Sequence, residues 1–189
     1  MGASGAHSRA GFVLAGGRSS RMGRDKALLS IGGTTLLEQV AERVREAAGD
    51  VTVIAEPERY ANLGLRIEHD LVDDSGPMGG IYTALQISSA RWNLIVACDM
   101  PRITVGLLND LFEAAETAAA PVLVPESASG LHPLCAIYHR QTLAAVEHCI
   151  NTRVLKMQDL LHHVGAVSWP VPDETLMENV NTVFEWGSR

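Results

Sequence analysis

The sequence predicts a single α/β domain in three layers (α/β/α), with helices on both faces of a mostly parallel, Rossmann-like sheet. Short apolar runs alternate with amphipathic segments along the chain, which is the pattern of βαβ units with right-handed crossovers. The first run is apolar at every position, as in a parallel strand that is covered on both faces. With 189 residues, 47% hydrophobic and 20% charged, the chain has an ordinary globular composition and enough length for one core. We expect a flexible tail over residues 1–9 and one domain over residues 10–189.

The first predicted strand covers residues 10–15 and ends at a pair of glycines, which marks the start of a loop. Residues 34–48 place apolar side chains at helical spacing. Thr35 and Glu38 match a capping box at the start of this helix, and Gly49 follows its end. The rest of the pattern predicts strands over residues 51–55, 65–68, 93–98, 121–124, 134–138 and 166–169, and helices over residues 80–87, 104–115, 141–149 and 154–161.

The overall charge argues against binding to nucleic acid or to an anionic membrane. Fifteen basic against 22 acidic residues give a net charge of −7, so a polyanionic ligand needs a local binding feature. The three cysteines lack the spacing of a disulfide framework or a zinc site. No apolar stretch reaches the length of a membrane span, and residues 1–9 do not resemble a signal peptide. We therefore expect a cytoplasmic protein.

A local basic cluster directly follows the glycines at the end of the first strand. Arg18, Arg21, Arg24 and Lys26 fall within nine residues. Glycine amides can approach phosphates closely, and fixed positive charge neutralises them, so the loop suits a nucleoside triphosphate. A strand-to-helix turn with solvated arginines is the alternative. Neither the P-loop pattern nor the Rossmann glycine fingerprint fits the spacing here.

Two acidic positions follow other predicted strands. Asp99 comes directly after the strand at residues 93–98, where an aspartate can reach a metal ion at the carboxyl edge of the sheet. Its hard oxygen suits Mg²⁺, although an aspartate near a proline is also a common turn residue. Asp70 follows the strand at residues 65–68 and, taken alone, is typical of a solvated loop. Residues 76–80 precede a helix that we expect to open at Ile81, so their amides form a candidate anion or base site.

The loop sequence Leu14-Ala-Gly-Gly-x-x-x-Arg21-Met-Gly-x-Asp25-Lys26 resembles the signature of the molybdenum cofactor guanylyltransferases (MobA-type). This family belongs to the wider group of nucleotidyltransferases with a nucleotide-diphospho-sugar transferase-like fold. The resemblance extends over residues 11–182. It implies an enzyme that transfers GMP from GTP to the phosphate of molybdopterin, forms the guanine dinucleotide cofactor and releases pyrophosphate.

The resemblance also implies a set of site residues. The catalytic residues are Arg21, Lys26 and Asp99, with Asp99 as the Mg²⁺ ligand. The GTP-binding residues are Leu14, Ala15, Gly16, Gly17, Lys26, Asp70, Gly76, Gly80 and Asp99. The residues on the molybdopterin side are Arg153, Asn179 and Asn181. Two departures from the family pattern, at residues 53–56 and 183–184, put one nucleoside contact and the terminal helix in doubt.

Two other functions remain open. The first is a related nucleotidyltransferase, such as a molybdopterin cytidylyltransferase or an enzyme acting on a sugar or lactate phosphate. The second is a non-catalytic nucleotide-binding protein of molybdoenzyme maturation, against which the presence of both Lys26 and Asp99 argues. The expected partners are GTP and molybdopterin, with transient contacts to the proteins that supply molybdopterin or mature molybdoenzymes.

Overall fold

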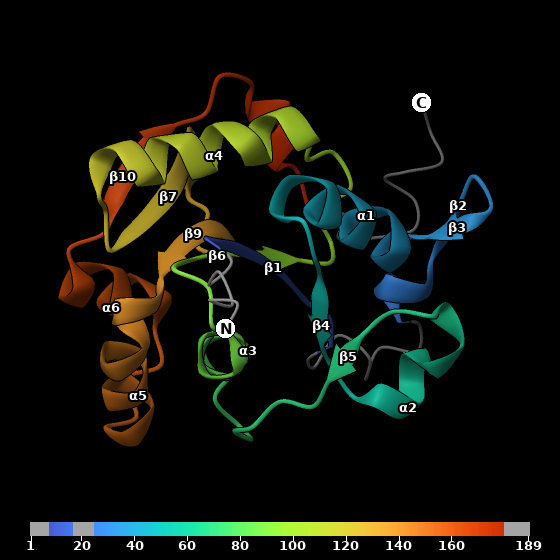
Figure 1. The fold of residues 1–189 in the computed structure, drawn as a ribbon, viewed down its shortest axis with the longest axis horizontal. Helices are drawn as coiled ribbons and strands as arrows, with labels where there is room; N and C mark the ends of the chain where they lie inside the picture. The colour runs from blue at the N-terminus through green and yellow to red at the C-terminus, as the bar shows by residue number, and fades with distance from the viewer. Residues whose placement is uncertain (1–7, 17–24, 180–189) are drawn as a thin grey trace, which may run out of the picture.

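The structure is a computed structural model that describes residues 8–16 and 25–179 (Figure 1). Its strands are β1 (Arg9–Leu14), β2 (Ser30–Ile31), β3 (Thr34–Thr35), β4 (Thr52–Ile54), β5 (Ile67–Glu68), β6 (Trp92–Ala97), β7 (Val122–Ser127), β8 (Gly130–Leu131), β9 (Cys135–His139) and β10 (Val167–Pro170). Its helices are α1 (Leu36–Ala48), α2 (Pro57–Tyr60), α3 (Pro77–Ile87), α4 (Val105–Ala118), α5 (Leu143–Asn151) and α6 (Met157–Val164). Short 3₁₀ turns are η2 (Lys26–Leu28), η3 (Ala61–Leu63), η4 (Arg140–Thr142) and η5 (Glu174–Met177).

The main sheet has the strand order β10-β7-β9-β6-β1-β4-β5, and β8 pairs with β7 beside this path. The central strand β1 is parallel to both of its neighbours, β4 and β6. Strand β9 runs antiparallel to β6 and β7, whereas β10 is parallel to β7. The sheet is therefore mostly parallel, as the apolar strands predict.

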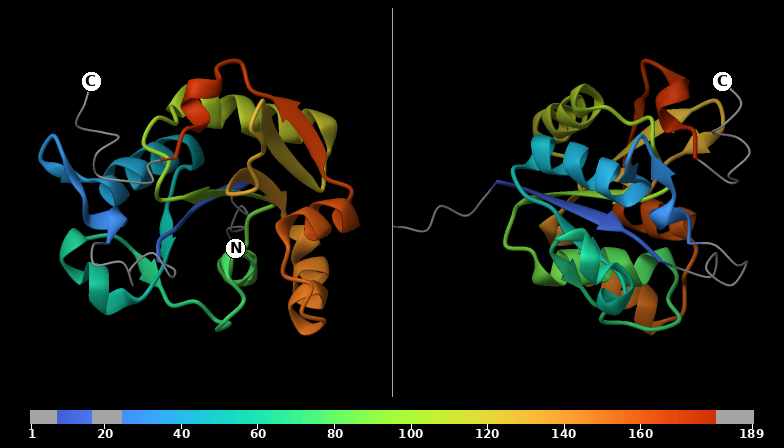
Figure 2. Two further views of the ribbon diagram at one scale, coloured as in Figure 1. Left: turned by 180° about the vertical axis from the view of Figure 1, so that it is seen from behind. Right: turned by 90° about the vertical axis from the view of Figure 1, so that its right-hand side faces the viewer.

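The helices cover both faces of this sheet, as Figures 1 and 2 show. Helices α1 and α4 pack on one face, and α3, α5 and α6 pack on the other, each group with its own buried apolar cluster. Strand β1 supplies both clusters, because Val13 faces the first and its neighbour Phe12 faces the second. The expected three-layer α/β/α class is confirmed.

Helix α1 begins and ends with the local signals read in the sequence. The hydroxyl of Thr35 accepts a hydrogen bond from the backbone N–H of Glu38 at 3.2 Å, and the Glu38 carboxylate accepts from the Thr35 N–H at 2.7 Å. At the other end Gly49 takes the left-handed conformation, with φ 89°. Both predicted caps of this helix are confirmed.

The hairpin formed by β2 and β3 was not expected from the sequence. Gly32 and Gly33 connect the two strands and both have positive φ, of 63° and 96°. A pair of glycines favours this tight hairpin turn, but strands of two residues are too short to show an alternating pattern. Figure 1 shows the hairpin projecting from the sheet beside α1.

Several element boundaries differ from the prediction by one to four residues, and three of these differences bear on the site or on the termini of elements near it. Strand β1 begins at Arg9, whose guanidinium pairs with Glu116 at 2.9 Å; residues 1–7 of the expected tail lie outside the described residues. Helix α3 begins at Pro77, four residues before Ile81, because proline is favoured at the first helical position. Helix α6 begins at Met157, since Arg153 has φ 58° and turns the chain after α5. In the part of the chain that the structure describes, no helix is long and apolar enough to span a membrane.

Candidate functional site

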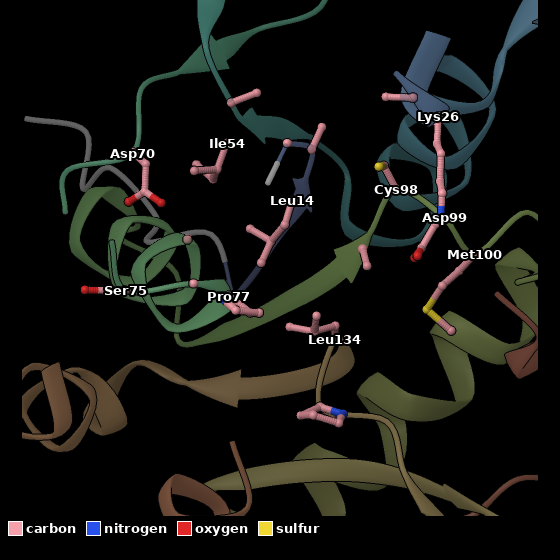
Figure 3. Close-up of a pocket in the computed structure, with 18 of the residues that line it drawn as sticks. Leu14, Lys26, Ile54, Asp70, Ser75, Pro77, Cys98, Asp99, Met100 and Leu134 are labelled. Atoms are coloured by element: carbon pink, nitrogen blue, oxygen red, sulfur yellow. The ribbon is translucent and has the colours of Figure 1, made fainter. Parts of the chain in front are cut away.

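A cavity of about 1050 Å³ opens at the carboxyl ends of β1, β4 and β6 (Figure 3). Strand β1 lies between β4, which follows it along the chain, and β6, which comes later, so the direction of winding reverses here. Open α/β sheets bind ligands at such a reversal, where the flanking loops leave in opposite directions. The cavity therefore lies where the fold itself favours a ligand site.

The end of β1 forms the floor of the cavity, with Leu14, Ala15 and Gly16 among its lining residues. The N–H of Ala15 donates to the carbonyl of Ile54 at 3.1 Å, and the N–H of Cys98 donates to the carbonyl of Leu14 at 3.1 Å. These bonds tie β1 to both neighbours up to its last residue. Gly16 then has φ 122°, a conformation that a residue with a Cβ rarely adopts. The glycine is needed to turn the chain out of the sheet.

Three of the predicted site residues, Gly17, Arg21 and Asn181, lie outside the described residues. The loop is described again from Asp25, and Lys26 opens the 3₁₀ turn η2. Lys26 lines the cavity and is partly buried. In Figure 3 its ammonium group points toward the carboxylate of Asp99. Two residues 73 positions apart in the sequence are thus brought close together in the structure.

Asp99 follows β6 and presents a carboxylate that the residues described by the structure do not fully satisfy. Its Oδ1 atom is buried and has no hydrogen-bond partner among the described residues. Burial raises the pKa of this carboxyl, and the nearby Lys26 ammonium opposes the rise. A buried oxygen without a donor is a suitable ligand for a cation. The described residues contain no group of three or more acidic, histidine or cysteine side chains that could hold a metal by themselves. Asp99 thus fits an ion that takes its other ligands from water and substrate phosphates.

The neighbouring thiol of Cys98 is not set up as a nucleophile. Cys98 lines the cavity, but burial raises the pKa of its thiol to about 12, and the carboxylates of Asp99 and Asp25 add to this rise. The reactive form of a cysteine is the thiolate, which is scarce at neutral pH under these conditions. Cys98 is therefore not a candidate nucleophile, and the charged side chains of the cavity, Lys26 and Asp99 among them, are the candidates for its chemistry.

Asp70 lies at the other end of the cavity, on the opposite side of Leu14 from Asp99 in Figure 3. Its Oδ1 accepts hydrogen bonds from the buried Thr83 hydroxyl at 2.7 Å and from the Val72 N–H at 3.2 Å. Its Oδ2 accepts none from the described residues. The carboxylate is thus held in one orientation by its Oδ1, while its Oδ2 has no donor from the described part of the chain.

The glycine segment at the start of α3 allows close packing around the cavity. Gly76 has φ 56° at the cap position, and it lines the cavity with Gly80. A Cβ on Gly80 would lie 2.9 Å from Leu14 Cδ2, and one on Gly79 would lie 2.9 Å from the carbonyl oxygen of Val72. Because the helix begins at Pro77, these two glycines belong to its first turn and let α3 approach the floor of the cavity and the Asp70 loop.

The residues expected on the molybdopterin side are only partly brought together. Asn179 lines the cavity, whereas Arg153 lies on an exposed turn after α5 and is not among the lining residues. His132 lines the cavity as well, with its Nε2 2.7 Å from the hydroxyl of Ser127. Burial lowers the pKa of this imidazole. The predicted strand over residues 134–138 begins two residues after His132, but no signal in the sequence pointed to Ser127.

Sequence reasoning also missed the hydrogen bond between Asp25 and Tyr60, and the place of Glu56 and Arg59 along the cavity. The position of Asp25 directly before Lys26 was a usable signal. Tyr60 had none, because a buried tyrosine in a short helix looks like any core residue. The departure from the family pattern at residues 53–56 does not remove this segment from the site, since its last three residues line the cavity.

Comparison with known proteins places the chain in a family. Residues 11–167 match the model of the MobA-like NTP transferase domain. A protein of Flavobacterium johnsoniae named "Probable molybdenum cofactor guanylyltransferase" is 37% identical over 153 residues, which cover 81% of this chain and 80% of the relative. A Nostoc protein of the same name is 35% identical over 180 residues, covering 90% of this chain and 85% of the relative.

Among solved structures, molybdopterin-guanine dinucleotide biosynthesis protein A from Archaeoglobus fulgidus superposes with a TM-score of 0.79 and 23% identity. The match covers 93% of this chain and 94% of the other, so the two proteins share the whole fold. The resemblance read from the loop residues is thereby confirmed over most of the sequence. The chain belongs to the family of MobA-like nucleotidyltransferases.

Proposed function

We propose that this protein transfers GMP from GTP to the phosphate of molybdopterin, forming the guanine dinucleotide form of the cofactor and releasing pyrophosphate. The observation that carries this proposal is the position of the Lys26 ammonium near the carboxylate of Asp99 at the carboxyl edge of the sheet, where Asp99 Oδ1 has no hydrogen-bond partner among the described residues. Family membership supports a nucleotidyl transfer, and the names of the relatives support GTP and molybdopterin as substrates.

The cavity has two ends that suit the two ends of GTP. Lys26 and Asp99 lie at one end, where positive charge and a cation ligand suit the phosphates. Asp70 lies at the other end, where its free Oδ2 suits the N1–H and N2–H₂ donors of guanine. Gly16, Gly76 and Gly80 also line the cavity, and without a Cβ they leave the backbone accessible. This orientation directs the α-phosphorus toward the Lys26 end.

The reaction requires positioning and charge stabilisation rather than a general base. A phosphate monoester is already ionised at neutral pH, so its oxygen can attack the α-phosphorus of GTP in line with the departing pyrophosphate. The Lys26 ammonium stabilises the charge on the α-phosphate and the leaving group. We propose Asp99 as the residue that holds Mg²⁺, which when bound neutralises phosphate charge.

The roles of residues outside this core remain predictions. Gly17 and Arg21 are proposed to complete the phosphate loop, and Asn179, Asn181 and Arg153 to serve the molybdopterin side. Arg153 would have to approach the cavity from its exposed turn to do so. The cytoplasmic location and the transient contacts with molybdopterin-supplying and molybdoenzyme-maturation proteins are likewise predictions.

The test is pyrophosphate release from GTP in the presence of molybdopterin, with and without Mg²⁺. We expect release with GTP, little with CTP or UTP, and a loss on the order of 10²-fold or more in Lys26→Ala and Asp99→Ala. Lys156→Ala and Asp110→Ala are matched controls, because both residues are exposed and lie outside the cavity lining. Preference for CTP would indicate a cytidylyltransferase. Binding of GTP without any release would indicate a non-catalytic protein.

A further inference from the structure

Asp25 and Tyr60 form a hydrogen bond beside the lysine that the mechanism uses. The Tyr60 hydroxyl donates to Asp25 Oδ2 at 2.7 Å, and the side chain of Tyr60 is only 1% exposed. The other oxygen of the same carboxylate, Oδ1, accepts from the N–H of Ala27 at 3.1 Å. Both oxygens of Asp25 are thus occupied by donors of the protein itself. Asp25 borders the cavity, and a protein donor on each oxygen fixes the orientation of its carboxylate.

This arrangement holds a turn that has little stability of its own. Lys26 opens the 3₁₀ turn η2, which spans three residues and buries only Ala27. The backbone bonds of the turn run from Leu28 N–H to the Asp25 carbonyl and from Leu29 N–H to the Lys26 carbonyl, both at 3.1 Å. Short 3₁₀ segments have poor hydrogen-bond geometry and depend on their surroundings. The Asp25 side chain caps this turn, and Tyr60 in turn holds Asp25.

Tyr60 connects the turn to a different wall of the cavity. It ends α2, which follows β4, and residues 54–56 and Arg59 of this connection line the cavity. Burial raises the pKa of the Tyr60 hydroxyl, and its hydrogen bond to Asp25 adds to the rise, so the hydroxyl stays protonated and remains a donor. The bond therefore joins two segments that are 35 positions apart in the sequence and border the same site.

We infer that Asp25 and Tyr60 are a positioning pair that sets the place of the Lys26 ammonium at the reacting phosphates. The inference rests on the proposed function for what Lys26 does there. Although Asp25 borders the cavity, we assign the pair a role that it exerts through the lysine carried by its turn. Charge stabilisation by a lysine depends steeply on its position, so a loosened turn lowers the rate of transfer more than the binding of GTP.

Tyr60→Phe tests this inference by removing one oxygen atom. Asp25→Ser removes the same bond in a second way, because serine still caps the turn but is too short to reach Tyr60. We expect both variants to lower kcat by about tenfold, since small displacements of a catalytic group cost one to two orders of magnitude. The KM for GTP stays close to that of the wild type. Tyr82→Phe is the matched control, because Tyr82 is partly buried on α3 and its hydroxyl makes no hydrogen bond with the described residues.

Double variants separate positioning from general damage. Combined with Asp25→Ser, Tyr60→Phe should cause no further loss, and in a Lys26→Ala background it should have no effect on kcat, because the pair acts through that lysine. A full additional loss in the Lys26→Ala background would overturn the inference, and so would wild-type kcat in both single variants. Circular dichroism at the assay temperature verifies that each variant is folded.

A second readout does not depend on the substrates. The chain has only two lysines, Lys26 and Lys156, so acylation by an amine-reactive reagent can be followed at each by peptide mass spectrometry. We expect Tyr60→Phe to accelerate acylation of the partly buried Lys26 and to leave the exposed Lys156 unchanged. If Lys26 is acylated faster in Tyr60→Phe but the wild type releases no pyrophosphate, the result would support the positioning pair and refute the proposed function. Unchanged labelling and kcat in an active enzyme would refute the pair alone.

Discussion

Asp99→Asn should make the protein more stable and far less active. The wild-type carboxylate is partly buried, and its Oδ1 lacks a hydrogen-bond partner among the described residues. Burial raises the pKa of Asp99 despite the nearby Lys26 ammonium, so the protein opposes the charge more than the lysine favours it. Asparagine keeps the shape of the side chain and removes the charge. The substitution therefore removes the free-energy cost of burying this charge, a cost to stability that the wild type retains for its function.

The size of the effect follows from the charge of one partly buried carboxylate, because the asparagine amide still places a polar atom at the same position. A buried charged group without a partner costs more than the about 1–3 kcal/mol of a neutral one, but Lys26 and solvent offset much of this cost at Asp99, so we expect a net gain of about 1 kcal/mol. In a chain of this size, that difference raises the Tm by roughly 2–4 °C. Transfer of GMP should fall by on the order of 10²-fold, because the proposed cation ligand is lost.

The sign of the pH dependence follows from the raised pKa. A carboxyl whose pKa is higher in the native state destabilises the fold above that pKa, where the native protein must give up a proton against the burial. Below the ordinary value of 3.8 the group is protonated in both states and the effect disappears. The stability advantage of Asp99→Asn is therefore full at pH 7 and shrinks as the pH falls through the native pKa of Asp99 toward 3.8.

The measurement is thermal unfolding at several pH values in EDTA without nucleotide, together with pyrophosphate release in Mg²⁺. Asp110→Asn is the control, because Asp110 is exposed on α4 and its charge costs the fold nothing by burial. A lower Tm for Asp99→Asn at pH 7 would refute the reasoning, since it would mean that the protein stabilises the ionised carboxylate. Full activity in the same variant would remove Asp99 from the mechanism.

Two further substitutions test the other end of the cavity. Thr83→Val removes the buried hydroxyl that donates to Asp70 and accepts from the Leu71 N–H at 2.9 Å. We expect it to lower the free energy of unfolding by about 1–3 kcal/mol and to reduce the preference for GTP over ATP in kcat/KM. An unchanged preference would argue against base recognition by Asp70. Gly80→Ala places a Cβ 2.9 Å from Leu14 Cδ2 and should raise the KM for GTP by about tenfold as Leu14 is pushed into the cavity. Gly106→Ala, whose Cβ would make an ordinary contact at 3.8 Å, should leave KM unchanged; an equal rise in both variants would contradict this explanation.

The sequence by itself was sufficient for the fold class, because the signals are local. Apolar strands, helical periodicity and the caps of α1 each depend on residues within a few positions of one another. The same holds for the glycine and basic residues that follow β1 in the sequence, which predict a phosphate site without any knowledge of the sheet. The hairpin at Gly32 and Gly33 was not predicted, because its two-residue strands are too short to show an alternating hydrophobic pattern.

What only the tertiary structure decided is which of these local features meet. The order of the strands brings Lys26 to Asp99, places Asp70 across Leu14 from them, and leaves Arg153 on an exposed turn. Strand order depends on how whole helices and strands pack, and the hydrophobic periodicity of the sequence does not determine it. The sequence could not show that Tyr60 donates to Asp25, or that Asp99 Oδ1 has no partner among the described residues. The burial and hydrogen bonding of single atoms depend on residues that are distant in the chain.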